Sequence, residues 1–377
     1  MTHPEARRLS DAERRDWLRL IRCETVGPIT FFALLRRFGT AREALEALPD
    51  LARRGGRQTP TKIRRPEDVE RELEATAAIG ARMIAHCEPD YPPLLAEIDD
   101  APPLVCVRGN TDLLTRPMVA MVGSRNASLN GRRFARRLAE DLGGVPLVIA
   151  SGLARGIDTA AHVGALETGT VAAVAGGIDV IYPEENRDLY DQIVSRGVVI
   201  SEVARGVRPQ ARHFPRRNRL ISGLARGVVV VEANMRSGSL ITARMALEQG
   251  REVFAVPGSP LDPRARGTND LIRQGAILTE SAADVRRALD EMMTPPPARP
   301  LAVDAGLTVT DLWGAREMEA ARRALAETLS PTPVTVDEII RTCQLSPPVV
   351  TTVLLEWELA GRLERHSGNK VSLVAPA

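Results

Sequence analysis

The sequence predicts an α/β protein built on a doubly wound parallel sheet, with a helical domain before the sheet and a winged helix after it. Three observations predict this. Between residues 83 and 279, short apolar runs alternate with helical segments, which is typical of a parallel sheet covered on both faces. The preceding residues show only helical spacing of apolar side chains. The last 67 residues show the pattern of three helices and one hairpin.

Residues 1–80 are expected to form the small helical domain. Gly27-Pro28 and Gly39-Thr40 provide start and stop signals. The predicted helices are Asp11–Arg22, Pro28–Phe38, Ala41–Leu48 and Pro66–Ile79. The stretch Arg53–Arg65 is polar and basic, and it interrupts the apolar pattern as a linker or exposed loop would.

Residues 81–294 are expected to form the sheet domain, because apolar runs and helical segments alternate along them. The predicted strands are Met118–Val122, Leu147–Ala150, Val171–Ala175, Val198–Ile200, Val228–Glu232, Val253–Val256 and Ala276–Thr279. The predicted helices between them are Gly131–Leu142, Ile157–Glu167, Leu240–Gln249 and Asn269–Gln274.

Residues 295–310 contain a run of prolines and small residues, which predicts a semi-rigid linker. Residues 311–377 follow as a separate domain. Its predicted helices are Arg316–Leu329, Val336–Cys343 and Pro347–Ala360, and its predicted hairpin pairs Leu363–His366 with Val371–Val374. Three helices and a two-stranded wing make a winged helix.

The composition excludes several classes of protein. The 377 residues contain 44% hydrophobic residues but no apolar run of membrane-spanning length and no apolar signal core, so we expect a cytoplasmic protein with no membrane contact. Four scattered cysteines indicate neither a zinc site nor disulfides. Aromatic residues make up only 3% of the chain, so base stacking must depend on one or two side chains.

Glycine-bearing loops follow several predicted strands, at the sheet edge where helix N-termini attract anions. In the first loop, Gly123 allows close approach to the backbone, Ser124 offers a hydroxyl and Arg125 a guanidinium. An ordinary turn explains this loop equally well. The second loop, Ser151–Asp158, includes Arg155 and matches neither a Walker loop nor GxGxxG, so a structural turn is the safer interpretation.

Asp158 and His162 follow that second loop, four residues apart on one predicted helix face. They could form an acid–base pair, but we favour a helix-start carboxylate with a packed histidine. The fourth loop, Ser237-Gly238-Ser239, offers hydroxyls at another helix start and could also hold a phosphate.

The third element is the stretch Ala204–Arg219, which holds six arginines and no acidic residue. A charge run is usually a solvated loop. Phe214, however, is one of six phenylalanines and lies inside this run. An aromatic ring flanked by cations is the minimum needed to stack a base and hold the neighbouring phosphates. Packing of Phe214 beside Leu220 and Ile221 in the core is the structural alternative.

These four elements predict a site for an extended polyanion, because they come from different parts of one sheet edge. No combination of nucleophile, base and oxyanion donor accompanies them: Asp158, Asp179 and Glu232 are isolated carboxylates. We therefore expect no catalytic residue, no metal and no cofactor.

The motifs resemble those of the DNA-processing protein A family, also called DprA or Smf. They are Tyr91-Pro92, Leu94-Leu95, Asp100-Ala101-Pro102, VGSR at 122–125, SGLARGID at 151–158, FPRRNRLISGL at 214–224, VVVVEA at 228–233, SGSLITA at 237–243, VPG at 256–258 and GTNDLIRQGA at 267–276. Any single motif is weak, but so many in one order are specific. The resemblance covers nearly the whole chain.

The resemblance implies a sterile-alpha-motif-like helical domain, an extended Rossmann domain and a winged helix. It also implies sequence-independent binding of single-stranded DNA, dimerisation through the Rossmann domain, and loading of the recombinase RecA onto DNA coated by single-strand-binding protein during DNA uptake, transformation and recombination. The expected DNA-binding residues are Gly123, Ser124, Arg125, Arg155, Arg212, Phe214, Arg216, Arg217, Asn218, Arg219, Ser237, Gly238 and Ser239. Arginine stands here at several positions where family members often carry lysine.

Two other classes of function remain open. A nucleotide-processing enzyme of the lysine-decarboxylase-like Rossmann group would use Glu232 or Glu248 as its catalytic carboxylate, although the PGGxGT motif of that group is missing. An adaptor that binds only proteins would use the winged helix as its working part. That helix, Pro347–Ala360, carries no lysine or arginine, so we do not expect it to be the main DNA reader.

Overall fold

The computed structural model describes residues 7–57, 59, 61–293, 315–366 and 368–374. Contacts divide these residues into two compact units. The first, the Rossmann unit, comprises residues 7–9 and 70–293, and the second comprises residues 10–69 and 315–374. The expected linker at 295–310 lies outside the described residues, and the division into four segments stays a prediction.

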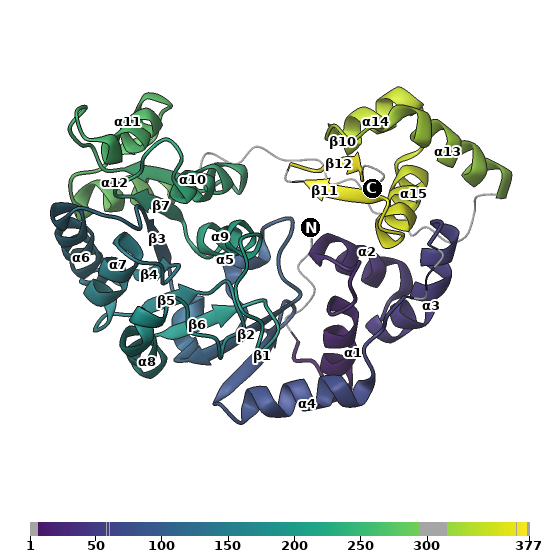
Figure 1. The fold of residues 1–377 in the computed structure, drawn as a ribbon, viewed down its shortest axis with the longest axis horizontal. Helices are drawn as coiled ribbons and strands as arrows, with labels where there is room; N and C mark the ends of the chain where they lie inside the picture. The colour runs from purple at the N-terminus through teal and green to yellow at the C-terminus, as the bar shows by residue number, and fades with distance from the viewer. Residues whose placement is uncertain (1–6, 58, 60, 294–314, 367, 375–377) are drawn as a thin grey trace. The chain divides into compact units, whose positions relative to one another are not determined.

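The Rossmann unit contains a mixed sheet with the strand order β1-β2-β6-β5-β4-β3-β7-β8-β9 (Figure 1). The chain winds outward from β3 to β6, crosses back to β7 beside β3, and continues to β9. The strands are β1 (Ala81–Ala85), β2 (Leu104–Gly109), β3 (Met118–Val122), β4 (Val148–Ser151), β5 (Thr170–Ala173), β6 (Val198–Ser201), β7 (Gly227–Val230), β8 (Glu252–Ala255) and β9 (Ile277–Leu278). Across the sheet, the strands in the order β6-β5-β4-β3-β7-β8-β9 are all parallel, which confirms the doubly wound α/β fold.

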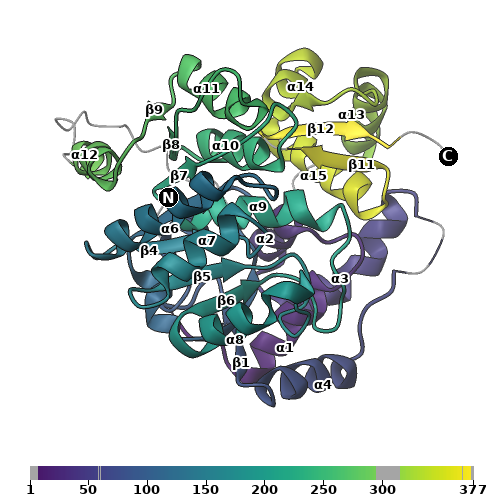
Figure 2. The ribbon, with the colours of Figure 1, turned by 60° about the vertical axis from the view of Figure 1, so that its left-hand side comes forward.

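Helices cover both faces of this sheet. They are α5 (Pro93–Ala96), α6 (Leu129–Gly143), α7 (Ile157–Ala165), α8 (Arg187–Arg196), α9 (His213–Leu224), α10 (Gly238–Glu248), α11 (Arg266–Arg273) and α12 (Ala282–Met293), with 3-10 turns η1 (Thr111–Thr115), η2 (Glu184–Asn186) and η3 (Pro263–Ala265). Alternate residues of β3 enter different cores: Ala120 packs with α9 and α10, and Met121 with α6 and α7. Figures 1 and 2 show these two helix pairs on opposite sides of the sheet.

Two edge strands are absent from the sequence prediction. β1 pairs with β2, and β2 pairs with β6, in both cases antiparallel. The strand β1 is only five residues long and carries an exposed arginine, Arg82, so its apolar pattern is weak. The two strands extend the parallel core on the side of β6.

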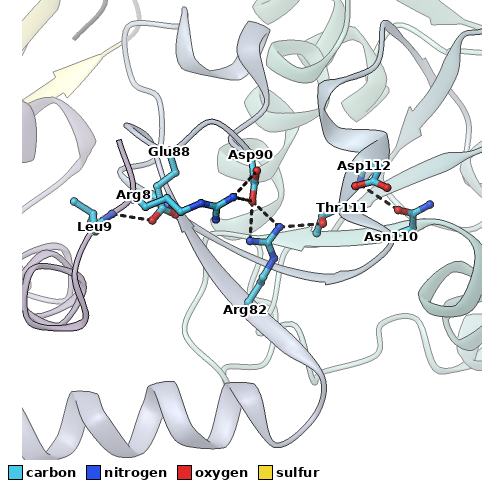
Figure 3. A network of polar contacts seen from close by, with 9 residues as sticks. Arg8, Leu9, Arg82, Glu88, Asp90, Asn110, Thr111 and Asp112 are labelled. Carbon is cyan, nitrogen blue, oxygen red and sulfur yellow. Dashed lines mark hydrogen bonds and ion pairs between the residues drawn. The ribbon is translucent and has the colours of Figure 1, made fainter. Parts of the chain in front are cut away.

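Polar contacts attach the first described residues to this edge (Figure 3). Arg8 and Arg82 both form ion pairs with Asp90, with N–O distances of 3.1 and 3.0 Å. The backbone N–H of Leu9 donates to the Glu88 carboxylate at 3.1 Å. These contacts explain why residues 7–9 group with the Rossmann unit although helices of the second unit follow them in sequence.

The second unit combines the N-terminal helices with the winged helix. Its helices are α1 (Asp11–Ile21), α2 (Pro28–Phe38), α3 (Ala41–Arg54), the start of α4 (Pro66–Ala77), α13 (Ala315–Thr328), α14 (Val336–Cys343) and α15 (Pro347–Leu359). The expected end of the third helix at Leu48 is wrong, because α3 continues through Pro49 and buries Leu51 and Ala52. A proline usually ends a helix, and here further core contacts outweigh it.

The wing consists of β11 (Leu363–His366) and β12 (Lys370–Leu373), as expected, and a short third strand, β10 (Val334–Thr335), pairs with β12. α15 packs against the helices of the winged helix and against α3. Its surface is therefore covered: among its thirteen residues only Pro347 and Thr351 are exposed.

Candidate nucleic-acid interface

The loops after β3 and β4 meet at the carboxyl edge of the sheet. Gly156 has a φ of +78°, and a Cβ there would press on the carbonyl oxygens of Ser124 and Arg125. Gly123 lies against the start of α7, because a Cβ on Gly123 would come within 2.6 Å of the Ile157 side chain. Both glycines are therefore needed for the two loops to pack against each other.

A pocket of about 240 Å³ opens beside these loops and is here named the base pocket. Residues after β3, β4 and β5 form its walls together with the start of α9. The lining residues are Arg125, Asn126, Gly152, Ala154, Arg155, Val174, Ala175, Gly176, Val180, Tyr182, Pro183, Pro209, Phe214 and Arg217. Ligand sites of open α/β sheets lie at this edge of the strands.

Two aromatic rings and a guanidinium meet in the base pocket. The ring centres of Phe214 and Tyr182 are 5.7 Å apart at an angle of 54°, and the Arg125 guanidinium carbon lies 5.1 Å from the Phe214 ring centre. Tyr182 is 51% exposed. Phe214 is half-buried and does not belong to the hydrophobic core clusters, so its position favours the stacking interpretation over the core alternative.

Arg217 forms a buried cation at the base of this pocket. Phe214 and Arg217 are three residues apart on α9 and so share one face. Arg217 is 5% exposed, and a Cβ on Gly152 would overlap its guanidinium. One terminal N–H donates to the carbonyl of Ala173 at 3.2 Å, while Nε has no partner among the described residues. Burial lowers the pKa of Arg217 to about 10, so the side chain is charged at neutral pH.

Asp158 and His162 support the second loop and do not form an acid–base pair. The Asp158 carboxylate accepts N–H groups of Gly152 and Ala154 at 3.2 and 3.3 Å. His162 Nε2 accepts the Leu153 N–H at 3.3 Å, and its Nδ1 lies 2.7 Å from the Thr170 hydroxyl. That hydroxyl donates to the carbonyl of Ile149, so Nδ1 is the protonated nitrogen. Burial raises the pKa of Asp158 and lowers that of His162 to about 3.

The other arginines of the basic stretch differ in whether they form ion pairs within the fold. Arg219 is buried and forms ion pairs with Glu202 and, at 3.3 Å, with Asp100. Arg216 also forms an ion pair with Glu202, at 2.9 Å, although it is exposed. The expectation that Arg219 contacts DNA is not supported, because its guanidinium is enclosed and paired within the fold. Arg212 is exposed at the N-cap of α9 and does not line the base pocket.

The Ser237–Ser239 turn also lies outside the lining of the base pocket. Ser237 caps α10 by accepting the Ser239 N–H, and the Asn218 amide donates to the Gly238 carbonyl at 3.4 Å. This turn therefore joins α9 to α10. Of the expected residues, Arg125, Arg155, Phe214 and Arg217 line the pocket, whereas Gly123, Ser124, Arg212, Arg216, Asn218, Arg219, Ser237, Gly238 and Ser239 do not.

Glu232 occupies the N-terminus of α6, the place where dinucleotide folds usually hold a pyrophosphate. Its carboxylate accepts the backbone N–H of Ser128 at 2.9 Å and the Ser128 hydroxyl at 2.6 Å. A Cβ on Gly131 would come within 2.5 Å of the same carboxylate. The chain therefore satisfies this anion site itself, which disfavours both a dinucleotide here and a catalytic role for Glu232.

Sequence reasoning missed Tyr182. It is one of only three tyrosines, and it follows β5, whose carboxyl end contributes to the same edge. Reading each strand end for aromatic side chains as well as glycines would have found it. Among the described residues, no group of acidic, histidine or cysteine side chains could hold a metal ion. No helix in the described part of the chain is long and apolar enough to cross a membrane.

Comparisons with known proteins agree with this architecture. Residues 82–290 match the sequence profile of DNA recombination-mediator protein A, residues 11–75 that of the DprA-like N-terminal HHH domain, and residues 294–369 that of the DprA winged helix domain. The chain is 51% identical to DNA processing protein DprA of Streptococcus pneumoniae over 197 residues, covering 52% of this chain and 70% of that protein. It is 38% identical to protein Smf of Escherichia coli over 288 residues, covering 75% of each.

Two solved structures are also similar. DNA processing protein A from Streptococcus pneumoniae superposes with a TM-score of 0.61 and 38% identity, covering 74% of this chain and 98% of that one. DNA processing protein A from Helicobacter pylori, described for its single-stranded DNA binding mode, gives a TM-score of 0.52 and 28% identity over 56% of this chain and 96% of that one. With three domain profiles matched along the chain and a relative 38% identical over 75% of both chains, the chain belongs to the DNA recombination-mediator protein A family, also called DprA or Smf.

Proposed function

We propose that this protein binds single-stranded DNA without sequence specificity, with a base in the base pocket and its phosphates on the surrounding arginines. The observation that carries the proposal is the meeting of Phe214, Tyr182, Arg125 and buried Arg217 in one hollow. Aromatic faces stack any base, while guanidiniums bind phosphates in a forked geometry. The Helicobacter pylori relative, described for single-stranded DNA binding, supports the same ligand.

The pocket favours a single strand because its aromatic rings contact a base only when that base is unstacked from its neighbours. Arg125 covers part of Phe214, and Tyr182, at 51% exposure, offers a second ring surface beside it. Stacking on such rings is tolerant of sequence because every base has a π-face. We therefore expect similar affinities for different homopolymers, and much weaker binding of a duplex.

Fluorescence anisotropy with labelled oligo-dT, oligo-dA and a blunt duplex at two salt concentrations tests this proposal. Tight, salt-dependent binding of both single strands and weak binding of the duplex is the expected result. Equal affinity for duplex and single strand would contradict it. Incubation with nucleoside monophosphates addresses the enzymatic alternative, for which we expect no release of free base.

We further propose that the protein loads RecA onto single-stranded DNA coated by single-strand-binding protein during DNA uptake and recombination. Membership of a recombination-mediator family supports this role. RecA forms filaments slowly on coated DNA, so a mediator should shorten the lag in DNA-dependent ATP hydrolysis by RecA. An unchanged lag in the presence of the protein would refute the loading role while leaving DNA binding intact.

We also propose that the protein forms a homodimer through the Rossmann unit. Apolar side chains are exposed on and just before α10, namely Met235 at 56%, Ile241 at 38% and Leu247 at 61%. Apolar side chains that gather into one exposed patch often mark a surface that a partner covers. Light scattering should report twice the monomer mass, and Leu247→Arg should halve it if these residues form the interface.

A further inference from the structure

A second hollow of about 520 Å³ adjoins the base pocket and is here named the α6–α7 groove. The charge of its lining is strongly one-sided, with five arginines and one glutamate. The lining residues are Arg125, Asn126, Ala127, Arg132, Arg133, Arg136, Arg155, Gly156, Thr159, Ala160, Val163, Glu185 and Asn186. Its volume lies in the range of about 300–1,000 Å³ typical of ligand sites.

The packing of two helices creates this groove. α6 and α7 lie side by side on one face of the sheet (Figures 1 and 2). They pack tightly at Gly164, where a Cβ would clash with the Arg136 carbonyl oxygen and come within 3.0 Å of the Ala139 Cβ. Toward their N-terminal ends, small residues such as Ala160 leave the floor open while arginines of α6 form the wall.

The arginines of the groove differ in how they are paired. Arg155 forms an ion pair with Glu185 at 2.6 Å, and Arg136 forms one with Glu140 at 2.9 Å. The side chains of Arg132 and Arg133, both exposed, form no hydrogen bond or ion pair within the described part of the chain. Two unpaired guanidiniums beside a hollow that contains three more produce a positive potential that attracts an anion.

The groove is continuous with the base pocket, because Arg125, Asn126 and Arg155 line both hollows. A polymer that places one base against Phe214 would therefore carry its next phosphates into the groove. A separate small anion would need enclosed hydrogen-bond donors, whereas the five arginines that line the groove are all exposed. This arrangement fits a flexible chain of phosphates.

We propose that the α6–α7 groove is a second subsite that takes the sugar–phosphate backbone of the nucleotides next to the one in the base pocket, with Arg132 and Arg133 as its phosphate contacts. This inference rests on the proposed binding of single-stranded DNA. The groove adds affinity only for a strand long enough to leave the base pocket, so the two subsites differ in their dependence on length.

The test compares two double variants that lose the same charge. Arg132→Ala/Arg133→Ala removes the groove contacts. Arg116→Ala/Arg137→Ala is the matched control: Arg116 precedes β3, at the amino edge of the sheet, and Arg137 lies on α6 outside the groove lining and forms an ion pair with Asp141 at 3.8 Å. All four side chains lie on the surface or partly so, and thermal melting checks that both variants fold.

Affinity for labelled oligo-dT of about sixteen nucleotides is measured by anisotropy over a range of salt concentrations, and affinity for the mononucleotide dTMP, which has no neighbouring nucleotide, is measured by its displacement of the labelled strand. For oligo-dT, the groove variant should bind about tenfold or more weakly, and the slope of log K against log salt should fall by about 1.4, or about 0.7 for each lost phosphate contact. For dTMP it should bind within about twofold of the unmodified protein, as the control variant should for both lengths of ligand.

Two results would overturn the inference. If the groove variant binds oligo-dT as the control variant does, Arg132 and Arg133 do not contact DNA. If it loses affinity equally for oligo-dT and dTMP, these arginines belong to the base pocket and no second subsite exists. Phe214→Ala distinguishes failure of the groove proposal from failure of the proposed function. If Phe214→Ala loses DNA affinity and the groove variant does not, only the groove proposal is refuted. If both variants bind DNA like the unmodified protein, the proposed DNA site is refuted.

Discussion

Two helices are candidates for DNA binding: α9 in the Rossmann unit and α15 in the winged helix. They differ in the side chains that they expose. The first turns of α9 present exposed Arg216 and half-buried Phe214. α15 occupies the position of a recognition helix, but it exposes only Pro347 and Thr351 and carries no basic residue. A recognition helix must offer side chains to a groove of DNA, so the comparison favours the proposed DNA site in the Rossmann unit over one on α15.

The acidic residues of α15 strengthen this contrast. Glu356 is 2% exposed and forms an ion pair with Arg322 at 2.8 Å, and Glu358 pairs with Arg365 at the same distance. These carboxylates hold the winged helix together and neutralise basic residues that could otherwise face a phosphate. On α9, by contrast, Arg219 pairs with Glu202, whereas the buried Arg217 lines the base pocket and interacts electrostatically with Asp158.

The largest expected difference between the two units is in how much stability each loses as the pH falls. Burial lowers the pKa of His162 to about 3, below the value of about 6.5 expected in the unfolded chain. The neutral imidazole therefore stabilises the Rossmann unit fully above about pH 6.5, and this contribution is lost as the pH falls, by up to about 1.4 kcal/mol per pH unit. No fully buried histidine lies among the described residues of the second unit, so this source of acid sensitivity belongs to the Rossmann unit.

Denaturant unfolding at several pH values, for the unmodified protein and His162→Gln, measures this effect. The variant should be less stable at pH 7 but should lose less stability than the parent between pH 6.5 and 4. Asp158 has a raised pKa and acts in the opposite direction, but it is present in both proteins and so cancels in the comparison. Parallel curves for the two proteins would show that His162 is not the neutral group inferred from its contacts.

The next effect concerns Phe214. Phe214→Ala should reduce oligo-dT affinity by about 1–3 kcal/mol, because a stacked base loses its platform, while Phe214→Trp should cost much less. The salt dependence should survive both changes, since the arginines determine it. Because Phe214 lies outside the hydrophobic core clusters, the melting temperature should change little. A melting temperature lowered by several degrees with unchanged affinity would make Phe214 a packing residue.

Removal of Arg125 should have a smaller effect. Arg125→Ala takes away one cation next to the base pocket, so we expect about tenfold weaker binding, and the slope of log K against log salt should fall by about 0.7 to 1. Arg137→Ala, which removes an exposed arginine outside both hollows, is the control. Full affinity with the full slope would reduce the Gly123–Arg125 loop to a structural turn.

The parallel strands β3 to β9 and the winged helix could be predicted from the sequence, because they depend on local apolar spacing and on turn residues, whereas β1 and β2 could not. Phe214 could also be singled out, since an aromatic side chain in a basic stretch is rare, and it lines the base pocket. The roles of individual arginines could not be read in the same way. Arg217 and Arg219 are two residues apart, yet one points to the base pocket and the other to Glu202, because α9 turns them to different faces.

Other features depended on contacts between distant segments. Tyr182 meets Phe214 only because the loop after β5 lies against α9 in the folded sheet. In the sequence, the arginines of α6 resemble an ordinary solvated helix face, because the groove that they line also requires residues of α7. The burial of α15 likewise depends on its packing against α3, which is more than 290 residues earlier in the chain.

The smallest expected effect is the loss of the winged helix itself. Truncation at about residue 300 should leave oligonucleotide affinity within about threefold, because the base pocket and the α6–α7 groove are both built from residues 125–217.

Truncation also uncovers α3, so a point variant provides a check that does not disturb packing. Thr351→Glu adds a negative charge at an exposed position of α15, and it should repel DNA only if α15 contacts it. A loss of more than tenfold on truncation, together with weaker binding by Thr351→Glu at low salt, would show that the winged helix reads DNA despite its lack of basic residues. Unchanged binding by both would leave the winged helix free to act on protein partners or in regulation, with the single strand held by the Rossmann unit alone.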